Sequence, residues 1–168
     1  MNTTITLELL HEDALAPRRA TEGSAGYDLF AYLSGRRVSV SDSVTVREMT
    51  AEGDGAAAHV MLAPGATARI PLGFKASLPA GFEAQIRPRS GSAFKKGLTV
   101  PNAPGTVDAD YPDEWMVLVR NAGPAPVRID HGERIAQMVL SRFEVLSFER
   151  GQVKQSTSRA GGFGSTGA

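Results

Sequence analysis

The chain of 168 residues contains no cysteine. Disulfides, thiolate nucleophiles and cysteine-based zinc sites are therefore excluded together, and the composition is compatible with a reducing compartment. Net charge is also missing, because 18 lysine and arginine residues balance 18 aspartate and glutamate residues. No overall field attracts the chain to nucleic acid or to an anionic membrane, so we expect it to bind neither, and any anion must be recognised by local groups.

Long apolar stretches are absent as well. No run approaches the ~20 residues that a membrane-spanning helix needs. The first residues, Met-Asn-Thr-Thr-Ile-Thr, lack the basic and apolar segments of a secretory signal. We therefore expect a soluble, cytoplasmic protein. With 42% hydrophobic residues, 168 residues are enough for one domain with a buried core.

The chain does contain short apolar or alternating runs, separated by Pro-Gly, Pro-Ala-Gly and Ala-Gly-Pro. These runs cover residues 5–10, 59–62, 67–70, 82–86, 116–119, 127–129 and 135–140. Their spacing predicts an all-β fold, either a sandwich or a barrel. Residues 90–97 predict one short helix that begins with serine and stops at glycine. Residues 41–58 are polar and rich in glycine and alanine, which predicts a surface hairpin or a flexible insertion.

Two segments have the composition of a binding site. Residues 105–115 place four carboxylates and Tyr111 in a turn that follows Pro104. Residues 159–167 form a glycine-rich tail around one aromatic residue, Phe163, and this tail cannot build a core. Taken separately, the turn is equally compatible with a solvated hairpin loop, and the tail with a disordered terminus.

Asp28 stands in an otherwise apolar strand, where an unpaired carboxylate would be costly to bury. It either pairs with a cation or caps a turn, and the isolated segment favours capping. Residues 87–91 place two arginines, a hydroxyl and a glycine at the start of the predicted helix, where an anion is favoured. The alternative is a solvated strand end with an N-cap.

Residues 134–139 predict a core strand with Arg134 and Gln137 at its polar margins. Gln137 is also a possible phosphate donor. On its own, this segment favours the structural interpretation.

Together, five segments in this order resemble the trimeric dUTP pyrophosphatase family over roughly residues 20–167. They are AGYDL at 25–29, RPRSG at 87–91, PNAPGTVDADY at 101–111, RIAQMV at 134–139 and GGFGSTG at 161–167. The resemblance implies a jelly-roll-like β-barrel with one short helix and a flexible C-terminal tail. It also implies a homotrimer with three sites shared between subunits, and Mg²⁺-dependent hydrolysis of dUTP to dUMP and pyrophosphate, which keeps uracil out of DNA.

The resemblance further implies a β-barrel domain over residues 1–158, with a surface insertion at about 41–58, and a mobile lid over 159–168. Asp108 would hold the water that attacks the α-phosphate, as a weak base assisted by a phosphate that metal neutralises. Asp28 would act on Mg²⁺ through a metal-bound water, because Mg²⁺ takes most of its ligands from water and substrate phosphates.

The substrate-binding residues that the resemblance implies fall into three groups. Phosphates would be contacted by Arg89, Ser90, Gly91 and Gln137. Uracil would be bound by Asn102 and by the backbone of the turn from 102 to 107, including Gly105 and Val107, while Tyr111 would pack under the deoxyribose and exclude a 2′-hydroxyl. The tail would close over the site with Phe163 on uracil and Arg159 on the terminal phosphate, next to Gly164 and Ser165.

The chain departs from the family pattern at two places. Pro112 and Asp113 follow Tyr111, where the family usually has a glycine at the second position. The tail is one residue shorter between Arg159 and Phe163 than is usual. Two alternatives remain: a dCTP deaminase-like enzyme, although that family's glutamate base is not found in the chain, and a non-catalytic trimeric module that binds nucleotides.

We predict that a chain ending at Ser158 stays folded and trimeric but loses most of its dUTP turnover. Residues 159–168 contain four glycines and one large apolar side chain, so they contribute little to a core. Stacking of Phe163 on a base should contribute about 1–3 kcal/mol. Thermal stability, oligomer mass and turnover check this outcome. Full activity would refute the lid, and loss of the trimer would assign the tail a structural role.

Overall fold

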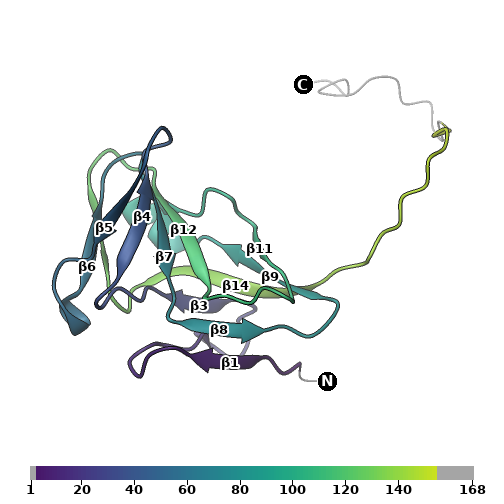
Figure 1. The fold of residues 1–168 in the computed structure, drawn as a ribbon, viewed down its shortest axis with the longest axis horizontal. Helices are drawn as coiled ribbons and strands as arrows, with labels where there is room; N and C mark the ends of the chain where they lie inside the picture. Colours follow the sequence, from purple (N-terminus) through teal and green to yellow (C-terminus); the bar gives the residue numbers. More distant parts are fainter. Residues whose placement is uncertain (1–2, 155–168) are drawn as a thin grey trace.

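The structure, a computed structural model, describes residues 3–154. In this part of the chain, two five-stranded and two two-stranded antiparallel sheets form the body, which confirms the all-β prediction (Figure 1). The first large sheet has the order β10 (Leu98–Thr99), β12 (Met116–Asn121), β7 (Thr67–Pro71), β4 (Arg37–Ser41) and β5 (Val46–Thr50). The second has the order β11 (Gly105–Val107), β9 (Phe82–Arg87), β14 (Arg134–Arg142), β3 (Tyr27–Phe30) and β2 (Arg18–Arg19).

The small sheets pair strands from distant parts of the sequence. They are β1 (Thr6–Leu9) with β8 (Phe74–Ser77), and β6 (His59–Leu62) with β13 (Val127–Asp130). Each of the seven runs predicted from apolar spacing contains a strand. Apolar spacing did not predict the other seven strands: β2, β3, β4, β5, β8, β10 and β11. Of these, β2, β5, β10 and β11 lie at sheet edges, whereas β3 and β4 are inner strands.

The core lies between the large sheets and consists of aliphatic side chains around two aromatic residues. Phe74 and Trp115 are fully buried, with ring centroids 5.4 Å apart. Among residues 3–154, no helix is long and apolar enough to cross a membrane.

Of the two forms expected for residues 41–58, the structure shows the hairpin. Strands β4 and β5 pair in register from Arg37 with Thr50 to Ser41 with Val46. Asp42 closes the turn, because its carboxylate accepts hydrogen bonds from the backbone of Thr45 and Val44. These bonds, with Thr45 the larger cause, lower the pKa of Asp42. A short 3-10 turn, η1 (Gly55–Ala57), follows.

The predicted helix is α1 (Ser90–Lys96), and it ends at Gly97 with a φ of 66°. A Cβ at Gly97 would lie 2.9 Å from the backbone nitrogen of Gly123, so both the conformation and the space favour glycine here. The helix begins at Ser90, as predicted. Arg89 occupies the N-cap position without a side-chain cap, and its guanidinium pairs with Asp28.

Residues 143–154 follow β14 and run away from the body without pairing to it as a strand (Figure 1). This segment contains exposed apolar side chains at Phe143, Val145, Leu146 and Phe148. The exposed fraction of Val145 is 87% and that of Phe148 is 91%. Apolar side chains this exposed are typical of a surface that a partner covers.

Asn121 should be essential for stability, because it is fully buried and ties three segments together. Its Nδ2 donates to the carbonyls of Leu62 and Ala125, and its Oδ1 accepts from the backbone of Gly123. We predict that Asn121→Ala lowers the free energy of unfolding by about 2–3 kcal/mol, since partners of buried hydrogen bonds are left unsatisfied. Urea unfolding at fixed protein concentration measures this loss.

The neighbouring Arg120→Ala serves as the control and should change stability by less than about 0.5 kcal/mol. Equal losses in the two variants would contradict the role of Asn121.

Candidate functional site

Strand β14 lies between β3 and β9 and aligns polar residues on all three strands. Gln137 stands opposite Asp28 on one side and opposite Arg87 on the other. Directly opposed residues in a sheet point to the same face, so these three side chains share the outer face. Leu29 and Met138, which directly follow Asp28 and Gln137 in their strands, point to the opposite face and are buried in the core.

Asp28 pairs with two arginines. Its Oδ1 accepts from Nε of Arg89 at 2.7 Å, and its Oδ2 accepts from Nη1 of Arg134 at 3.1 Å. The Asp28 side chain is only 13% exposed, so it requires such partners. Of the two alternatives for Asp28, the cation pair is therefore correct and the turn cap, which the sequence favoured, is wrong.

The loop between β9 and α1 is fixed against β14. Nε2 of Gln137 donates to the carbonyl of Pro88 at 3.0 Å, and Nη1 of Arg89 donates to the carbonyl of Arg134 at 3.3 Å. Ser90 and Gly91 follow as the first residues of α1. The structure therefore brings five of the predicted site residues together: Asp28, Arg89, Ser90, Gly91 and Gln137.

A hollow of about 280 Å³ adjoins this group. Arg89, Arg134, Lys95 and Lys96 line it, and Glu133 is the carboxylate among its lining residues. Glu133 pairs with Lys96, so the remaining cations give the hollow a positive charge. A positive hollow beside a hydroxyl and an amide suits a phosphate-bearing ligand.

The other predicted residues lie around β11. The side chain of Asn102 folds against Gly105, whose Cβ, if present, would lie 2.9 Å from Nδ2 of Asn102. Val107 ends the strand, and the backbone of Tyr111 then donates to the carbonyl of Asp108 in a turn. This turn is the segment with four carboxylates.

One of the four carboxylates holds the end of this turn in place. Glu114 is largely buried, accepts from the backbone of Gly73 at 2.9 Å and pairs with Arg36. Asp108 and Tyr111 lie instead at a hollow of about 670 Å³, which Arg69 and Lys75 also line. The exposed fraction of Tyr111 is 41%, so its ring is accessible.

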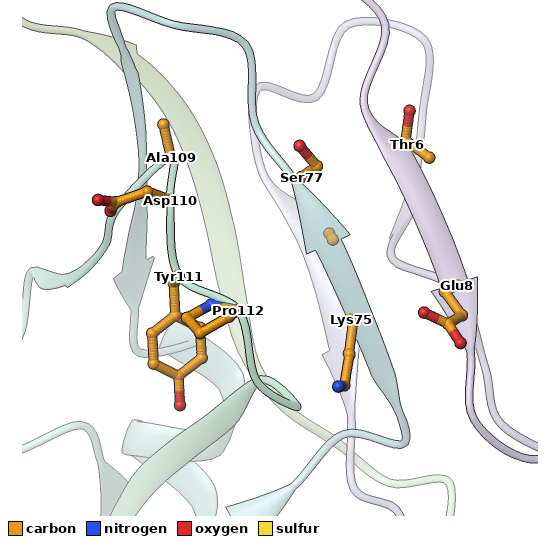
Figure 2. Close-up of a pocket in the computed structure, with 9 residues that line it drawn as sticks. Thr6, Glu8, Lys75, Ser77, Ala109, Asp110, Tyr111 and Pro112 are labelled. Atoms are coloured by element: carbon orange, nitrogen blue, oxygen red, sulfur yellow. The ribbon is translucent and has the colours of Figure 1, made fainter.

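A second hollow at this turn, of about 320 Å³, lies between the turn and the sheet of β1 and β8. Figure 2 shows Asp110, Tyr111 and Pro112 on one side of it, and Lys75 and Glu8 on the other. Tyr111 and Lys75 line both hollows. Pro112 therefore shapes this second hollow, whereas Asp113, where the family usually has a glycine, lines the hollow of about 670 Å³.

The two groups of residues are far apart within one chain. Val107 pairs with Ala84 of β9, whereas Gln137 pairs with Arg87 of the same strand. Asp108 is one residue past Val107, so it lies about 13 Å along β9 from Arg87. The structure does not bring Asp108 to the arginines. Four further predicted residues lie outside the described residues: Arg159, Phe163, Gly164 and Ser165.

Sequence reasoning missed the roles of two residues. Arg134 was expected at the polar margin of a core strand, but it pairs with Asp28. The sequence offered two signals for this pair. Arg134 is a single cation at the start of one apolar strand, and Asp28 is a single acid in another. Glu114 gave no signal of its own, because its partners Gly73 and Arg36 are remote in sequence.

Comparison with known proteins gives a consistent result. A sequence model of the dUTPase family matches residues 55–167. The deoxyuridine 5'-triphosphate nucleotidohydrolase of Rhizobium rhizogenes (strain K84 / ATCC BAA-868) is 44% identical over 152 residues, which cover 90% of this chain and 84% of that protein.

Solved structures match as well. The dUTPase of Staphylococcus bacteriophage 80alpha with dUPNHPP is 23% identical, with a TM-score of 0.74 over 99% of this chain and 100% of that one. The dUTPase of Streptococcus mutans is 25% identical, with a TM-score of 0.63 over 84% and 98%. A mutant dUTPase of phage phi11 of S. aureus, described with a structural Mg(II) ion, is 21% identical, with a TM-score of 0.69 over 91% and 99%. These matches confirm the jelly-roll-like fold.

Proposed function

The chain belongs to the dUTPase family and hydrolyses dUTP, and we propose that water attacks the α-phosphate to give dUMP and pyrophosphate. The observation that best supports this proposal is the pairing of Arg89 with Asp28 beside Gln137, which forms a phosphate-binding group on one sheet. Neither the deaminase nor the non-catalytic module is favoured. Pyrophosphate release measured across the common nucleoside triphosphates, with ammonia release from dCTP, tests the assignment.

The phosphates are bound by the group around Arg89. Two of the five N–H groups of Arg89 bond to Asp28 and to the carbonyl of Arg134 in the described part of the chain. The remaining three are available to phosphate oxygens. Ser90 adds a hydroxyl, Gly91 a backbone amide, and Gln137 the second hydrogen of its amide. Arg134 fixes Asp28 from the other side and so orients Arg89.

Uracil is bound at β11. This strand is at the edge of its sheet, so only one side of its backbone pairs with β9. The other side presents N–H and C=O groups, which match the alternating donors and acceptors on the edge of uracil. Asn102, Gly105 and Val107 are on or beside this edge, and the ring of Tyr111 packs under the deoxyribose, where it excludes a 2′-hydroxyl.

Asp108 is the general base. It directly follows the strand that binds the base, so its carboxylate lies beyond the sugar, toward the α-phosphate. A carboxylate there accepts a hydrogen bond from the attacking water and takes up its proton as the oxygen–phosphorus bond forms. Its exposure at a hollow allows water to reach it.

Mg²⁺ would be held mainly by the triphosphate and by water. Residues 3–154 contain no cluster of three or more His, Cys, Asp or Glu that could bind a metal. Both oxygens of Asp28 are engaged by arginines, yet each retains a lone pair that can accept from a water molecule. This donor set fits an ion whose ligands are mainly water and phosphate, with Asp28 acting indirectly. When bound, the ion neutralises charge on the phosphates.

The active protein is a homotrimer with three sites, each shared between subunits. Asp108 lies about 13 Å along one β9 from Arg87, and Arg89 follows beyond Arg87, too far for both to act on one α-phosphate. A neighbouring copy can supply the missing half. The exposed apolar side chains of residues 143–148 are suited to contact with such a copy. We propose that the tail residues Arg159, Phe163, Gly164 and Ser165, which lie outside the described residues, close the site. The cytoplasmic location of the protein stays a prediction.

We predict that Asp108→Asn lowers kcat by at least about a hundredfold while dUTP binding largely survives. The amide keeps the size of the carboxylate but cannot take a proton from water. Asp110→Asn is the matched control, because Asp110 lies in the same turn and lines the second hollow, and it should retain most of its activity. Near-normal kcat for Asp108→Asn would remove Asp108 from the mechanism.

Tyr111→Ala should relax the discrimination between deoxyribose and ribose. Exclusion of a hydroxyl by a ring is steric and disappears with the ring, so UTP should be accepted relatively better. The ratio of kcat/KM for dUTP to that for UTP measures this effect. Tyr111→Phe keeps the ring and should keep the ratio. If Tyr111→Ala leaves the ratio unchanged, sugar selection depends on other residues.

A further inference from the structure

Gly26 lies one residue before β3 and two residues before Asp28. Residues two apart in an extended chain project to the same side, so a side chain at position 26 would share the outer face with Asp28 and Gln137. A Cβ built on Gly26 would lie 2.4 Å from Oε1 of Gln137 and 3.2 Å from its Cδ. Position 26 and the Gln137 amide therefore compete for the same space.

The backbone does not account for a glycine at this position. Gly26 is absent from the glycines with positive φ, the conformation that favours glycine over other residues. The feature that favours glycine at position 26 is therefore the Gln137 side chain, which occupies the place of a Cβ. Gly23, in the same connection between β2 and β3, also has no positive φ, and a Cβ there would meet nothing within 4 Å.

The Gln137 amide has a defined orientation. Its Nε2 donates one hydrogen to the carbonyl of Pro88, directly before Arg89. An amide nitrogen has two hydrogens, so the second is available to a ligand beside Arg89. Displacing the amide would break the bond to Pro88 and turn the second hydrogen away from that position.

We propose that Gly26 is a positioning residue, which reserves the space in which the Gln137 amide holds the loop of Pro88 and donates to a phosphate of dUTP. The proposal rests on the proposed function in one respect, namely that Gln137 contacts the substrate. Gly26 itself touches no reacting atom, and its effect is transmitted through Gln137.

The test compares Gly26→Ala with Gly23→Ala in the full-length protein. Gly26→Ala should lower kcat/KM for dUTP about tenfold, mainly through a higher KM, as expected for loss of one hydrogen bond to a charged group. Its unfolding temperature should fall about 2–4 °C below that of Gly23→Ala, because displacing the amide breaks the hydrogen bond from Gln137 to the carbonyl of Pro88. Gly23→Ala should retain wild-type kinetics. Wild-type kinetics in Gly26→Ala would overturn the proposal.

A double-mutant cycle with Gln137→Ala tests the route of the effect. In the absence of the amide, Gly26→Ala should cause no further loss of kcat/KM or of unfolding temperature. Losses that add in full would show that Gly26 acts without Gln137, which contradicts the proposal. If Gly26→Ala alone does not fold, recovery of folding in the double variant supports the steric conflict, and failure of both variants to fold overturns it.

The same experiments separate this inference from the proposed function. A wild-type chain that does not turn over dUTP would contradict the proposed function. The unfolding temperatures of the cycle depend only on the contact between position 26 and Gln137. Additive temperatures would therefore contradict the inference even if dUTP hydrolysis is confirmed.

Discussion

The register of β14 between β3 and β9 is the constraint on which the rest of the site depends. It sets Gln137 opposite both Asp28 and Arg87 on the outer face, while Leu29 and Met138 fill the core. A shift of one residue would exchange these faces and bury a carboxylate without a partner. The same register places Arg134 and Arg89 on the two oxygens of Asp28. Core packing and the arrangement of the proposed phosphate-binding group are thus fixed by one set of strand pairings.

The pairing of β11 with β9 has the opposite effect, because it separates the second half of the site from the first. Asp108 and Tyr111 follow β11 beside the beginning of β9, whereas Arg89 comes just after the end of β9. The separation leaves β11 with an open backbone edge, where we propose that the base binds, and leaves the arginines at a hollow that we propose for the phosphates. Each chain then offers two half-sites, which suits assembly into a closed ring of identical subunits.

Local sequence patterns predicted the β class, the seven apolar strands and the short helix, because alternation and glycine stops depend on neighbouring residues. They predicted the hairpin that contains β5 only as one of two forms, because the side chains of β5 are mostly exposed at a sheet edge, and they did not place Arg89 at the N-cap of α1. The partners of Asp28 and Glu114 were also missed, since Arg134 and Arg36 are remote in sequence. Likewise, the close approach of Gln137 to Gly26 could not be predicted, because it depends on the pairing of β14 with β3. Roles carried by the tail lie outside the described residues.

In the proposed trimer, the arginine group of one subunit works with Asp108 of another. The direct measurement mixes two inactive variants, Arg89→Ala and Asp108→Asn, after unfolding and refolding them together, and records dUTP turnover. Shared sites predict recovery to roughly a quarter of wild-type activity in an equal mixture, because one in about four random subunit pairs contributes both intact halves. A mixture as inactive as either variant alone, with the trimer intact, would show that each site is built within one chain and contradict the account.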